Sequence, residues 1–355
     1  MVVLHIANVK NNPFSGVSVV VPQHINTQNK YATVGFINIS NRKIDVLASQ
    51  FEYREDFNIN NLPAPYNTPD VVIIHEVYYK EYLKIGKNLK TNGIPYVIVP
   101  HGSLAVTALK KKKIKKAIAN ALYFKKFIKN AVALQCLSET EKNETKFHTN
   151  KFIGTNGVVK PTNVKTTFSK TDKTIVYIGR LEAYTKGLDL MIEAIKIKKE
   201  YFQEQNCKFY IYGPDYKNRR KVLNKLIKDN DVQDIVELRD AVNGIEKEKI
   251  ILSADIFIQT SRVEGMPLGI LEALSYGLPC LVTKGTNTGE IVKKYNAGWV
   301  AETNTTSIAN KLIEAIFDSN VWVEKSQNCI RLIEENFSWD KISNKAIQDY
   351  ERVSK

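Results

Sequence analysis

Short runs of β-branched and aromatic residues recur along the chain, and stretches with helical spacing separate several of them. In the first half the runs lie at 2–9, 32–39, 71–77 and 96–100. Strands that alternate with helices are typical of βαβ units, in which helices cover a parallel sheet. The pattern therefore predicts a Rossmann-like domain in the first half of the chain.

The same pattern begins again after the polar, irregular stretch at 159–173, which is rich in Thr and Lys. The new apolar runs lie at 173–179, 207–213, 254–260 and 278–283. We expect a second Rossmann-like domain there, with 159–173 as the linker. Two doubly wound domains in tandem leave a cleft between them, and open α/β sheets bind ligands beyond the carboxyl ends of their strands.

The composition is that of a globular protein. The chain has 355 residues, more than one hydrophobic core usually supports, with 43% hydrophobic and 25% charged residues. No apolar run reaches the roughly 18 residues of a membrane span. The start, MVVLHIANV, lacks the leader and cleavage site of a signal peptide, and the four cysteines are scattered singly. We expect a cytoplasmic protein, at most peripheral on the inner face of the cytoplasmic membrane.

Basic residues outnumber acidic ones by 51 to 37, which gives a formal net charge of +14. Such an excess favours anionic partners, which include nucleic acid, phosphorylated substrates and acidic lipid. The chain lacks aromatic RNP strands, zinc-ligand spacing and a recognition-helix signature. We therefore rank a nucleic-acid-binding protein below an enzyme and expect no nucleic acid among the partners.

One basic stretch, 109–131, has the spacing of an amphipathic helix. Its apolar residues recur every three or four positions: Ile114, Ala117, Ala121, Phe124, Ile128 and Ala131. A helix with such a stripe and lysines around it either lies on an anionic membrane or packs onto the first sheet with its lysines in solvent. Both alternatives stay open at this point.

Two cations lie in the segment YIGRLEAYTKGLD at 177–189. A predicted strand ends at Gly179, Arg180 follows it, and Lys186 lies just before a predicted helix. The arginine fork and the lysine point charge together suit a diphosphate that gathers charge as it leaves. The structural alternative is that both side chains merely cap a solvated loop.

Two carboxylates lie in the segment SRVEGMPLGILEALSYGLP at 261–279. Glu264 is in a predicted loop, and Glu272 is on the helix that follows. Pro267 suits the first turn of that helix, and Gly265 permits a close backbone approach to a ligand. The free amides of a helix start bind anions. Carboxylates beside such a site need hydroxyl donors, which sugars and riboses supply.

These motifs together resemble the retaining nucleotide-sugar glycosyltransferases of family four. The resemblance rests on two glutamates separated by seven residues within EGMPLGILEALSYGLP, and on the segment GRLEAYTKG that precedes them. It is strong across 175–295 and extends to LSETE at 137–141, TNGV at 155–158 and FSWDKI at 337–342. Several motifs in the same order are more specific than any one of them alone.

The resemblance implies an α/β protein of the GT-B fold, with two Rossmann-like domains facing across a cleft. Residues 1–160 would form the acceptor-side domain and residues 161–337 the nucleotide-sugar-binding domain. Residues 338–355 would form a helix that crosses back to the first domain. Domain closure about the linker would then exclude water from the reaction.

The resemblance also assigns roles by position. Arg180 and Lys186 would bind the donor diphosphate, and Glu272 would accept hydrogen bonds from the ribose hydroxyls. Glu264, with the backbone amides that follow it, would hold the donor sugar, and the backbone near 235–242 would read the base. The donor-binding residues that it implies are Gly16, Gly179, Gly265, Met266, Pro267, Leu268 and Glu272.

The first half of the chain carries fewer candidates. His101 follows a predicted strand where the family often places a histidine near the transferred sugar, which implies a catalytic role; a lone histidine is otherwise often structural. His75 and Glu76 end another strand and could face the acceptor. In NPFSGVS at 12–18 only Gly16 stands for the family's glycine-rich loop, and Pro22 is expected to interrupt the next helix.

The resemblance thus implies a retaining, metal-independent hexosyltransferase. It would move a sugar from a nucleotide-diphosphate sugar, such as a UDP-sugar, to a glycan or lipid-linked acceptor in surface polysaccharide or lipopolysaccharide assembly. Because side-chain cations can neutralise the leaving diphosphate, we expect no metal and no cofactor besides the donor substrate. The rivals are a nucleotide-sugar epimerase of the same fold and a glycoside hydrolase, whose two carboxylates would not need the cations.

Overall fold

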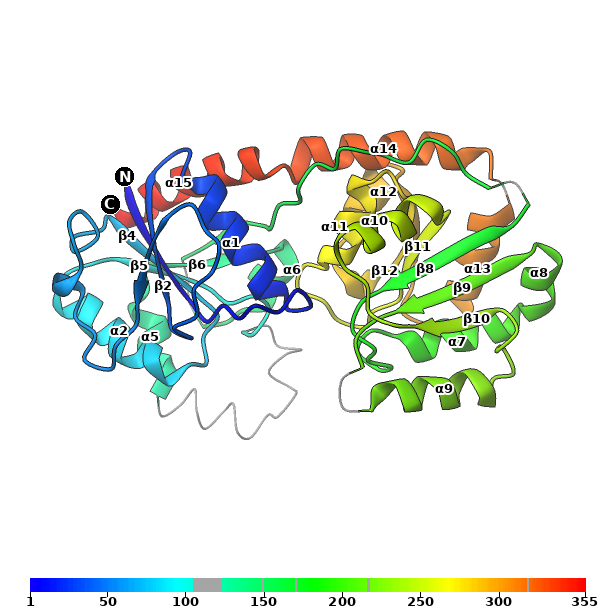
Figure 1. Cartoon of the computed structure of the whole chain (residues 1–355), viewed down its shortest axis with the longest axis horizontal. Helices are drawn as coiled ribbons and strands as arrows, with labels where there is room; N and C mark the ends of the chain where they lie inside the picture. Colours follow the sequence, from blue (N-terminus) through cyan, green and yellow to red (C-terminus); the bar gives the residue numbers. More distant parts are fainter. Residues whose placement is uncertain (105–122, 148–149, 170, 216–217, 318) are drawn as a thin grey trace. The chain divides into compact units, whose positions relative to one another are not determined.

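The computed structural model describes residues 1–104, 123–147, 150–169, 171–215, 218–317 and 319–355. The chain divides into two compact units, which are taken one at a time below (Figure 1). The first unit consists of Met1–Gly157 with Trp339–Lys355, and the second consists of Val158–Ser338. Both are α/β units, as the alternating apolar runs predict.

The first unit is built on a seven-stranded parallel sheet with the order β3-β2-β1-β4-β5-β6-β7. Its strands are β1 (Val2–Ala7), β2 (Thr33–Asn38), β3 (Ser49–Glu52), β4 (Val71–His75), β5 (Tyr96–Val99), β6 (Ala133–Cys136) and β7 (Lys151–Ile153). The central strands are buried on both faces, which is why they read as continuous apolar runs. The four runs predicted in this half are confirmed as β1, β2, β4 and β5.

The helices of this unit pack against the sheet. They are α1 (Gly16–Gln28), η1 (Ile59–Asn61), α2 (Lys80–Thr91), α5 (Lys125–Asn130), α6 (Glu139–Glu144) and α15 (Trp339–Ser354). The C-terminal helix α15 packs on α1: the Thr27 and Ser343 hydroxyls lie 2.6 Å apart, and the Trp339 ring meets the edge of the His24 ring at 4.7 Å. The chain therefore returns to the first unit for its last helix.

The prediction that Pro22 interrupts a helix is wrong. Helix α1 runs through Pro22 from Gly16 to Gln28 without a break. A proline inside a helix removes one backbone hydrogen bond and costs about 3 kcal/mol. Burial of Val20, Val21 and Ile25 against the sheet offsets that cost.

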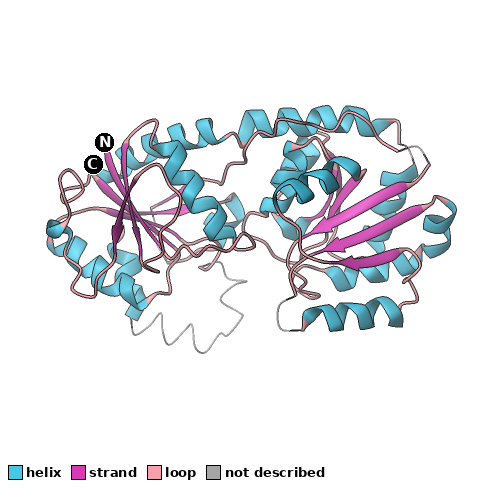
Figure 2. Cartoon of the chain, viewed as in Figure 1, coloured by secondary structure: helices cyan, strands magenta, loops and turns pink. Residues whose placement is uncertain are grey.

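The second unit is a six-stranded parallel sheet with the order β10-β9-β8-β11-β12-β13. Its strands are β8 (Lys173–Ile178), β9 (Cys207–Tyr212), β10 (Val236–Arg239), β11 (Ile256–Gln259), β12 (Cys280–Thr283) and β13 (Gly298–Ala301). Figure 2 shows helices on both faces of this sheet. This is the strand order of a Rossmann fold, in which the direction of winding reverses between β8 and β11.

The helices of the second unit follow the strands in turn. They are α7 (Leu188–Ile197), α8 (Lys199–Glu204), α9 (Arg219–Asp229), α10 (Gly244–Ser253), α11 (Leu268–Ser275), η3 (Lys284–Thr286), α12 (Gly289–Lys294), α13 (Thr305–Phe317) and α14 (Val321–Asn336). The core contains large buried side chains such as Tyr177, Phe209 and Trp322. The four apolar runs predicted in this half are confirmed as β8, β9, β11 and β12.

Most of the basic stretch 109–131 lies outside the described residues, so its proposed contact with a membrane stays a prediction. Its described end packs into the core of the first unit, where Phe124, Ile128 and Ala131 are buried. Among the helices that the structure describes, none combines the length and the apolar character that crossing a bilayer demands. The four cysteines are buried and unpaired, which agrees with a packing role.

Candidate functional site

Two loops meet at the carboxyl edge of the second sheet, after the neighbouring central strands β8 and β11. Gly187, which ends the first loop, has a left-handed φ of +65°, and a Cβ there would lie 1.9 Å from the Thr260 carbonyl oxygen. The Thr260 hydroxyl donates to the Gly187 carbonyl oxygen at 2.7 Å. Only glycine permits this approach, which brings Lys186 against the loop that carries Glu264.

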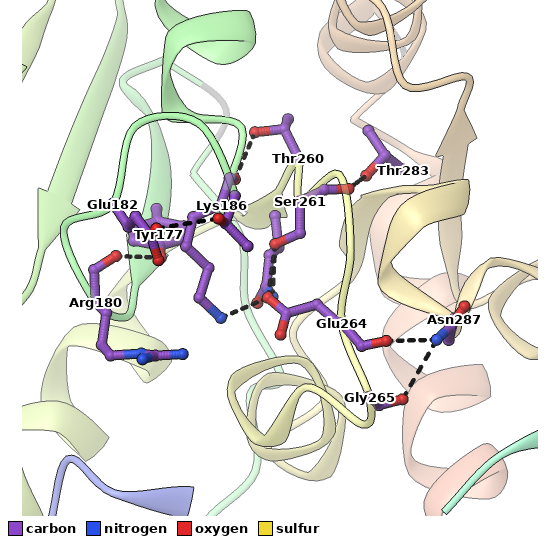
Figure 3. Close-up of polar contacts among 12 residues, drawn as sticks. Tyr177, Arg180, Glu182, Lys186, Thr260, Ser261, Glu264, Gly265, Thr283 and Asn287 are labelled. Atoms are coloured by element: carbon purple, nitrogen blue, oxygen red, sulfur yellow. Dashed lines mark hydrogen bonds and ion pairs between the residues drawn. The ribbon is translucent and has the colours of Figure 1, made fainter. Parts of the chain in front are cut away.

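Several hydrogen bonds at this edge converge on the Glu264 carboxylate (Figure 3). Its Oε1 accepts hydrogen bonds from the Lys186 ammonium, from Gln259 Nε2 at 2.9 Å and from the Ser261 hydroxyl at 2.7 Å. The Lys186 and Glu264 side chains are each 12% exposed, so this ion pair is shielded from most of the solvent. In the described part of the chain no donor reaches the second carboxylate oxygen.

The loop around Glu264 is fixed by hydrogen bonds along its backbone. The Glu264 amide donates to the Gly285 carbonyl oxygen at 2.9 Å, and the Asn287 side-chain amide donates to the Glu264 carbonyl oxygen. The Thr283 hydroxyl donates to the Ser261 carbonyl oxygen at 2.7 Å (Figure 3). These contacts hold the carboxylate in one place before any ligand binds.

Arg180 contributes a second cation to the same edge. Its side chain is exposed, and its guanidinium makes no ion pair or hydrogen bond with any described residue. Its carbonyl oxygen accepts from the Tyr177 hydroxyl at 3.0 Å, which fixes the backbone from which the side chain extends. Figure 3 shows the Arg180 guanidinium and the Lys186 ammonium both extending toward the Glu264 loop. Lys186 and Glu264 therefore form one site, and Arg180 extends from the same carboxyl edge.

Helix α11 begins at Leu268, and Pro267 is its N-cap residue, one position earlier than predicted. The amides of Leu268 and Gly269 have no acceptor within the helix, because the first turn of any helix leaves its amides unpaired. Gly265 and Met266 form the turn before Pro267, and both are partly exposed.

Glu272 lies one turn into α11, where its Oε1 accepts from Lys247 of α10 at 2.6 Å. Lys247, Gln259 and Ser261 were not among the predicted site residues. Their proximity comes from the tertiary fold, because no short motif contains them all.

The stretch 235–242, which was predicted to read a base, forms β10 and the turn after it. Arg239 ends this strand, stacks on the Tyr210 ring with 4.2 Å between the guanidinium carbon and the ring centroid, and donates to Glu237 at 2.9 Å. Gly179, at the end of β8, donates its amide to the Tyr212 carbonyl oxygen at 3.0 Å. These residues frame the same carboxyl edge on the side of β9 and β10.

At the carboxyl edge of the first sheet the structure joins two of the predicted residues directly. His75 is the last residue of β4, His101 follows β5, and their ring nitrogens Nδ1 and Nε2 lie 3.1 Å apart. Glu76 and His101 both have a left-handed φ, of +68° and +50°. Glu76 accepts from the Tyr79 hydroxyl at 3.0 Å, and burial raises the pKa of its carboxyl group. Gly16, the remaining prediction in this unit, is the first residue of α1.

Three residues at this edge were not predicted. Glu141, buried at the start of α6, accepts from the Gly102 amide at 2.6 Å and so holds the loop that carries His101. His5 lies in the middle of β1, where its place inside an apolar run gave no sign of a polar contact. His24 on α1 donates from Nε2 to Asn156 Oδ1 at 3.3 Å.

His5 extends the contact between His75 and His101. Its Nδ1 lies 2.9 Å from His75 Nε2, and its Nε2 lies 2.9 Å from Gln28 Oε1. Burial lowers the pKa of His5 to about 3 and of His101 to about 3, and it lowers the pKa of His75 well below the ordinary value. These imidazoles are therefore neutral at physiological pH.

Comparison with known proteins finds glycosyltransferases among both the family models and the similar sequences. Residues 160–335 match the family model described as "Glycosyl transferases group 1". An uncharacterized glycosyltransferase of Methanocaldococcus jannaschii is 29% identical over 180 residues, which cover 50% of this chain and 45% of that protein. The putative colanic acid biosynthesis glycosyltransferase WcaL of Escherichia coli is 30% identical over 145 residues, which cover 39% of this chain and 34% of that protein. The chain thus spans less than half the length of these two relatives.

Solved structures match along the whole chain. Sucrose-phosphate synthase from Thermosynechococcus elongatus has a TM-score of 0.75 and 15% identity, and the match covers 99% of this chain and 98% of that one. HepE of Anabaena, in complex with UDP and glucose, has a TM-score of 0.71 and 15% identity, and covers 99% of each chain. At this identity the likeness concerns the fold alone.

Proposed function

We propose that this chain, whose residues 160–335 match the group 1 glycosyl transferases, transfers a sugar from a nucleotide-diphosphate sugar to a glycan or lipid-linked acceptor. Its fold is the predicted α/β GT-B fold, with two parallel sheets of seven and six strands in two Rossmann-like units. The geometry of the second unit supports this assignment, as does the family that its residues match.

The observation that carries the proposal is the pairing of Lys186 with Glu264, with the Arg180 guanidinium at the same edge making no ion pair or hydrogen bond to a described residue. An ammonium group has three donors, and Glu264 takes one of those of Lys186. Lys186 can therefore hold a phosphate oxygen and the carboxylate together, so that the sugar-binding and phosphate-binding groups are fixed relative to each other. Arg180 supplies a bidentate fork for the second phosphate, and the amides of the first turn of α11 add further donors.

We propose that the transfer retains the anomeric configuration and needs no metal ion or cofactor. Retention follows the family resemblance of the Glu264 and Glu272 motif. Arg180 and Lys186 would stabilise the negative charge of the departing diphosphate, a role that a divalent cation fills in other transferases. Transfer that continues in the presence of a strong chelator, such as EDTA, is the expected outcome, and complete loss of activity that Mg²⁺ or Mn²⁺ restores would contradict it.

The acceptor side of the proposal rests on the relatives. WcaL is named for colanic acid biosynthesis, and a further relative is named as a galactosyltransferase acting on a diphosphoundecaprenol-linked sugar. We propose that this chain likewise works in surface polysaccharide or lipopolysaccharide assembly on the cytoplasmic side of the membrane. The predicted basic stretch at 109–131 would help it reach a lipid-linked acceptor through anionic lipid.

A two-step experiment tests the function. First, UDP-, GDP- and ADP-sugars are screened for their effect on the melting temperature. A donor at about 100 times its Kd should stabilise the protein by about 2.7 kcal/mol, or roughly 5 to 10 °C. Second, the donor that binds is incubated with undecaprenyl-diphosphate-linked sugars, and the products are weighed by mass spectrometry.

A gain of one sugar mass on the acceptor, with release of the nucleoside diphosphate, is the expected result. A changed nucleotide sugar with no acceptor consumed would instead identify the enzyme as an epimerase. If no nucleotide sugar shifted the melting temperature and no product formed, the proposal would be wrong. The variant Glu264→Gln is compared with the wild type in both assays. It keeps the shape of the site and removes the charge that Lys186 pairs with.

A further inference from the structure

Two ion pairs of opposite direction join the loops at the carboxyl edge of the second sheet. In the pair described above, the cation Lys186 belongs to the loop after β8, residues 179–187, here named the Lys186 loop, and the anion Glu264 to the loop after β11. In the other pair the cation is Arg262, beside Glu264 in sequence, and the anion is Asp189, in the first turn of α7. Arg262 Nη1 donates to Asp189 Oδ1 at 2.6 Å, and the two side chains are 22% and 23% exposed.

Arg262 contacts the Lys186 loop at further points, all of them just before Lys186. Its Nη1 also donates to the Tyr184 carbonyl oxygen at 2.6 Å, and its guanidinium carbon lies 4.3 Å from the centroid of the Tyr184 ring. Its backbone amide donates to the Thr185 carbonyl oxygen at 2.9 Å. A guanidinium can make such contacts together, because it donates along its edge and stacks with its face. Arg262 thus fixes the two residues that precede Lys186.

The residue after Lys186 is fixed from the same neighbouring loop. The Thr260 hydroxyl donates to the Gly187 carbonyl oxygen at 2.7 Å. Within the Lys186 loop itself, the amides of Lys186 and Gly187 donate to the carbonyl oxygens of Glu182 and Tyr184, each at 3.2 Å, the long end of the usual range. The loop therefore takes its shape largely from the residues that follow β11.

Arg262 could instead bind a phosphate group itself, since it is a guanidinium close to Lys186. Two observations argue against this role. Asp189 neutralises its charge, and Nη1 already donates both to that carboxylate and to the Tyr184 carbonyl oxygen. Arg180, in contrast, is exposed and makes no ion pair or hydrogen bond with a described residue. The two arginines therefore differ in what they hold: Arg262 holds the protein, and Arg180 is available to a ligand.

We propose that Arg262 and Asp189 are positioning residues that act through Lys186. Their ion pair holds the Lys186 loop in place while a bound diphosphate shares the Lys186 ammonium with Glu264. The first statement, that the pair fixes the Lys186 loop, concerns the protein alone. The second statement, that it thereby sets the affinity for the phosphate that carries the sugar, rests on the proposed function.

The second statement singles out one of the two phosphates. Lys186 contacts Glu264, which holds the sugar in the proposed function, so the phosphate at Lys186 is the one bonded to the sugar. A nucleoside diphosphate has this phosphate, whereas a nucleoside monophosphate lacks it. A loosened Lys186 loop should therefore weaken the binding of the diphosphate and leave that of the monophosphate nearly unchanged.

Hydrogen exchange of the ligand-free full chain, followed by mass spectrometry, tests the first statement. In Asp189→Asn and in Arg262→Gln the amides of 182–187 should exchange about tenfold faster than in the wild type, because a charge-assisted hydrogen bond no longer opposes local opening. Arg262→Gln keeps the carboxylate in the first turn of α7, so it separates the loss of the ion pair from the loss of a helix charge. Unchanged exchange in both variants would overturn the first statement.

Asp229→Asn is the matched control. It makes the same chemical change to an aspartate that pairs with Lys225 at 2.8 Å, at the last residue of α9. It should leave the exchange of 182–187 at the wild-type rate, and an equal acceleration in this variant would show that the effect is not specific to the pair of Arg262 and Asp189.

Calorimetric titrations with UDP and UMP, GDP and GMP, and ADP and AMP test the second statement. For the diphosphate that the wild type binds, Kd should rise about 3- to 10-fold in Asp189→Asn and in Arg262→Gln, the cost of ordering one long side chain on binding. The Kd of the matching monophosphate should change by less than about twofold. Equal losses for both nucleotides would mean general damage to the unit and would overturn the second statement.

Asp189→Asn gives the sharpest result, because charge alone predicts the opposite sign. Removal of a negative charge near a bound diphosphate should tighten binding by simple electrostatics, whereas a loosened Lys186 loop should weaken it. Tighter binding in Asp189→Asn together with weaker binding in Arg262→Gln would show that Arg262 binds phosphate itself, and the proposal would be wrong. Since Asn has the shape of Asp, this variant decides the matter even if Arg262→Gln does not fold.

The double variant Arg262→Gln/Asp189→Asn tests whether the two residues act as one unit. Its Kd for the diphosphate should be close to that of the weaker single variant, because the ion pair can be lost only once. Losses that multiply would show independent roles and would contradict the proposal. If the wild type binds none of the three diphosphates, the proposed function and the second statement fall together, and hydrogen exchange still decides the first.

Discussion

Acid should destabilise the first unit far more than the second. All five histidines of the chain lie within residues 1–157, and the second unit has none. Burial lowers the pKa of His5 to about 3 and of His24 to about 4, and lowers that of His75 well below its ordinary value of 6.5. Below pH 6.5 these histidines therefore bind protons in the unfolded chain but remain neutral in the folded unit.

The sign and size follow from this difference. Below pH 6.5 the unfolded state binds more protons than the folded state, so the free energy of unfolding falls as the pH falls from 6.5 toward about 4. At pH 5.5 each fully buried histidine costs about 1.4 kcal/mol, or about 4 kcal/mol for His5, His24 and His75 together. The raised pKa values of the Glu76 and Glu141 carboxyl groups act in the opposite sense, which makes 4 kcal/mol an upper figure. A typical domain has only about 5 to 15 kcal/mol of stability in total.

Urea unfolding at pH 7.5, 6.5 and 5.5, followed by hydrogen exchange and mass spectrometry, would measure the two units separately. Peptides from β1 and β4 should lose protection at lower urea concentration as the pH falls, while peptides from β8 and β11 serve as the internal control. In His24→Gln, which keeps a hydrogen-bonding side chain beside Asn156, the loss between pH 7.5 and 5.5 should shrink by about 1.4 kcal/mol. Equal pH dependence of the two units would refute the reasoning, because it would mean that the histidines titrate normally in the folded state.

Four further substitutions probe the second unit and helix α1. Arg180→Ala should lower kcat by about 100- to 1,000-fold in steady-state transfer assays, while the free energy of unfolding changes by less than about 0.5 kcal/mol; a near-normal kcat would remove the diphosphate role. Gly187→Ala, which drives a Cβ to 1.9 Å from the Thr260 carbonyl oxygen at a φ of +65°, should cost more than about 2 kcal/mol in urea unfolding. Gly244→Ala, at a φ of +52° with no atom within 4 Å, should cost only about 1 kcal/mol, and similar costs at the two sites would show that the clash is absent. Pro22→Ala should raise the melting temperature. The helix hydrogen bond that it restores stabilises the folded state by more than the unfolded chain gains in entropy when the rigid proline is removed. A lower melting temperature would contradict this account of α1.

The parts of the fold that the sequence predicts are those whose strands are buried on both faces. The central strands β1, β4, β8 and β11 read as continuous apolar runs, and their predicted positions agree with the structure. Strands β3 (SQFE) and β13 (GWVA) were missed because each has only four residues, and β3 is also mixed in polarity. The prediction for helix α1 was wrong because it considered only the local effect of Pro22, whereas the packing of the helix against the rest of the unit decides its course.

The residues of the candidate site also divide into those that a local motif predicts and those that only the tertiary fold brings together. Arg180, Lys186 and Glu264 could be found because each lies in a local motif whose spacing has a chemical reason. The contacts that hold Glu264 could not be found in this way, because Gln259 and Ser261 are ordinary residues until β11 brings them to one carboxylate oxygen. The role of His5 could not be predicted for a similar reason, since its hydrogen-bond partner His75 is 70 residues away in the sequence.

The two carboxyl edges differ in charge, and under the proposed function this difference would decide which part of a nucleotide sugar each edge recognises. The edge of the second sheet keeps Arg180 exposed and Lys186 in an ion pair with Glu264, so in the proposed reaction it would attract the diphosphate, where most of the donor's charge lies. The edge of the first sheet buries its histidines as neutral rings, so it offers directed hydrogen bonds without net charge. A neutral acceptor discriminates among hydroxyl groups, because a partner that lacks the proton leaves a polar nitrogen unpaired at a cost of about 1 to 3 kcal/mol. Replacement of Arg180 or Lys186 should therefore weaken the binding of all nucleotide sugars alike, whereas replacement of His75 or His101 should alter the preference between one sugar and another.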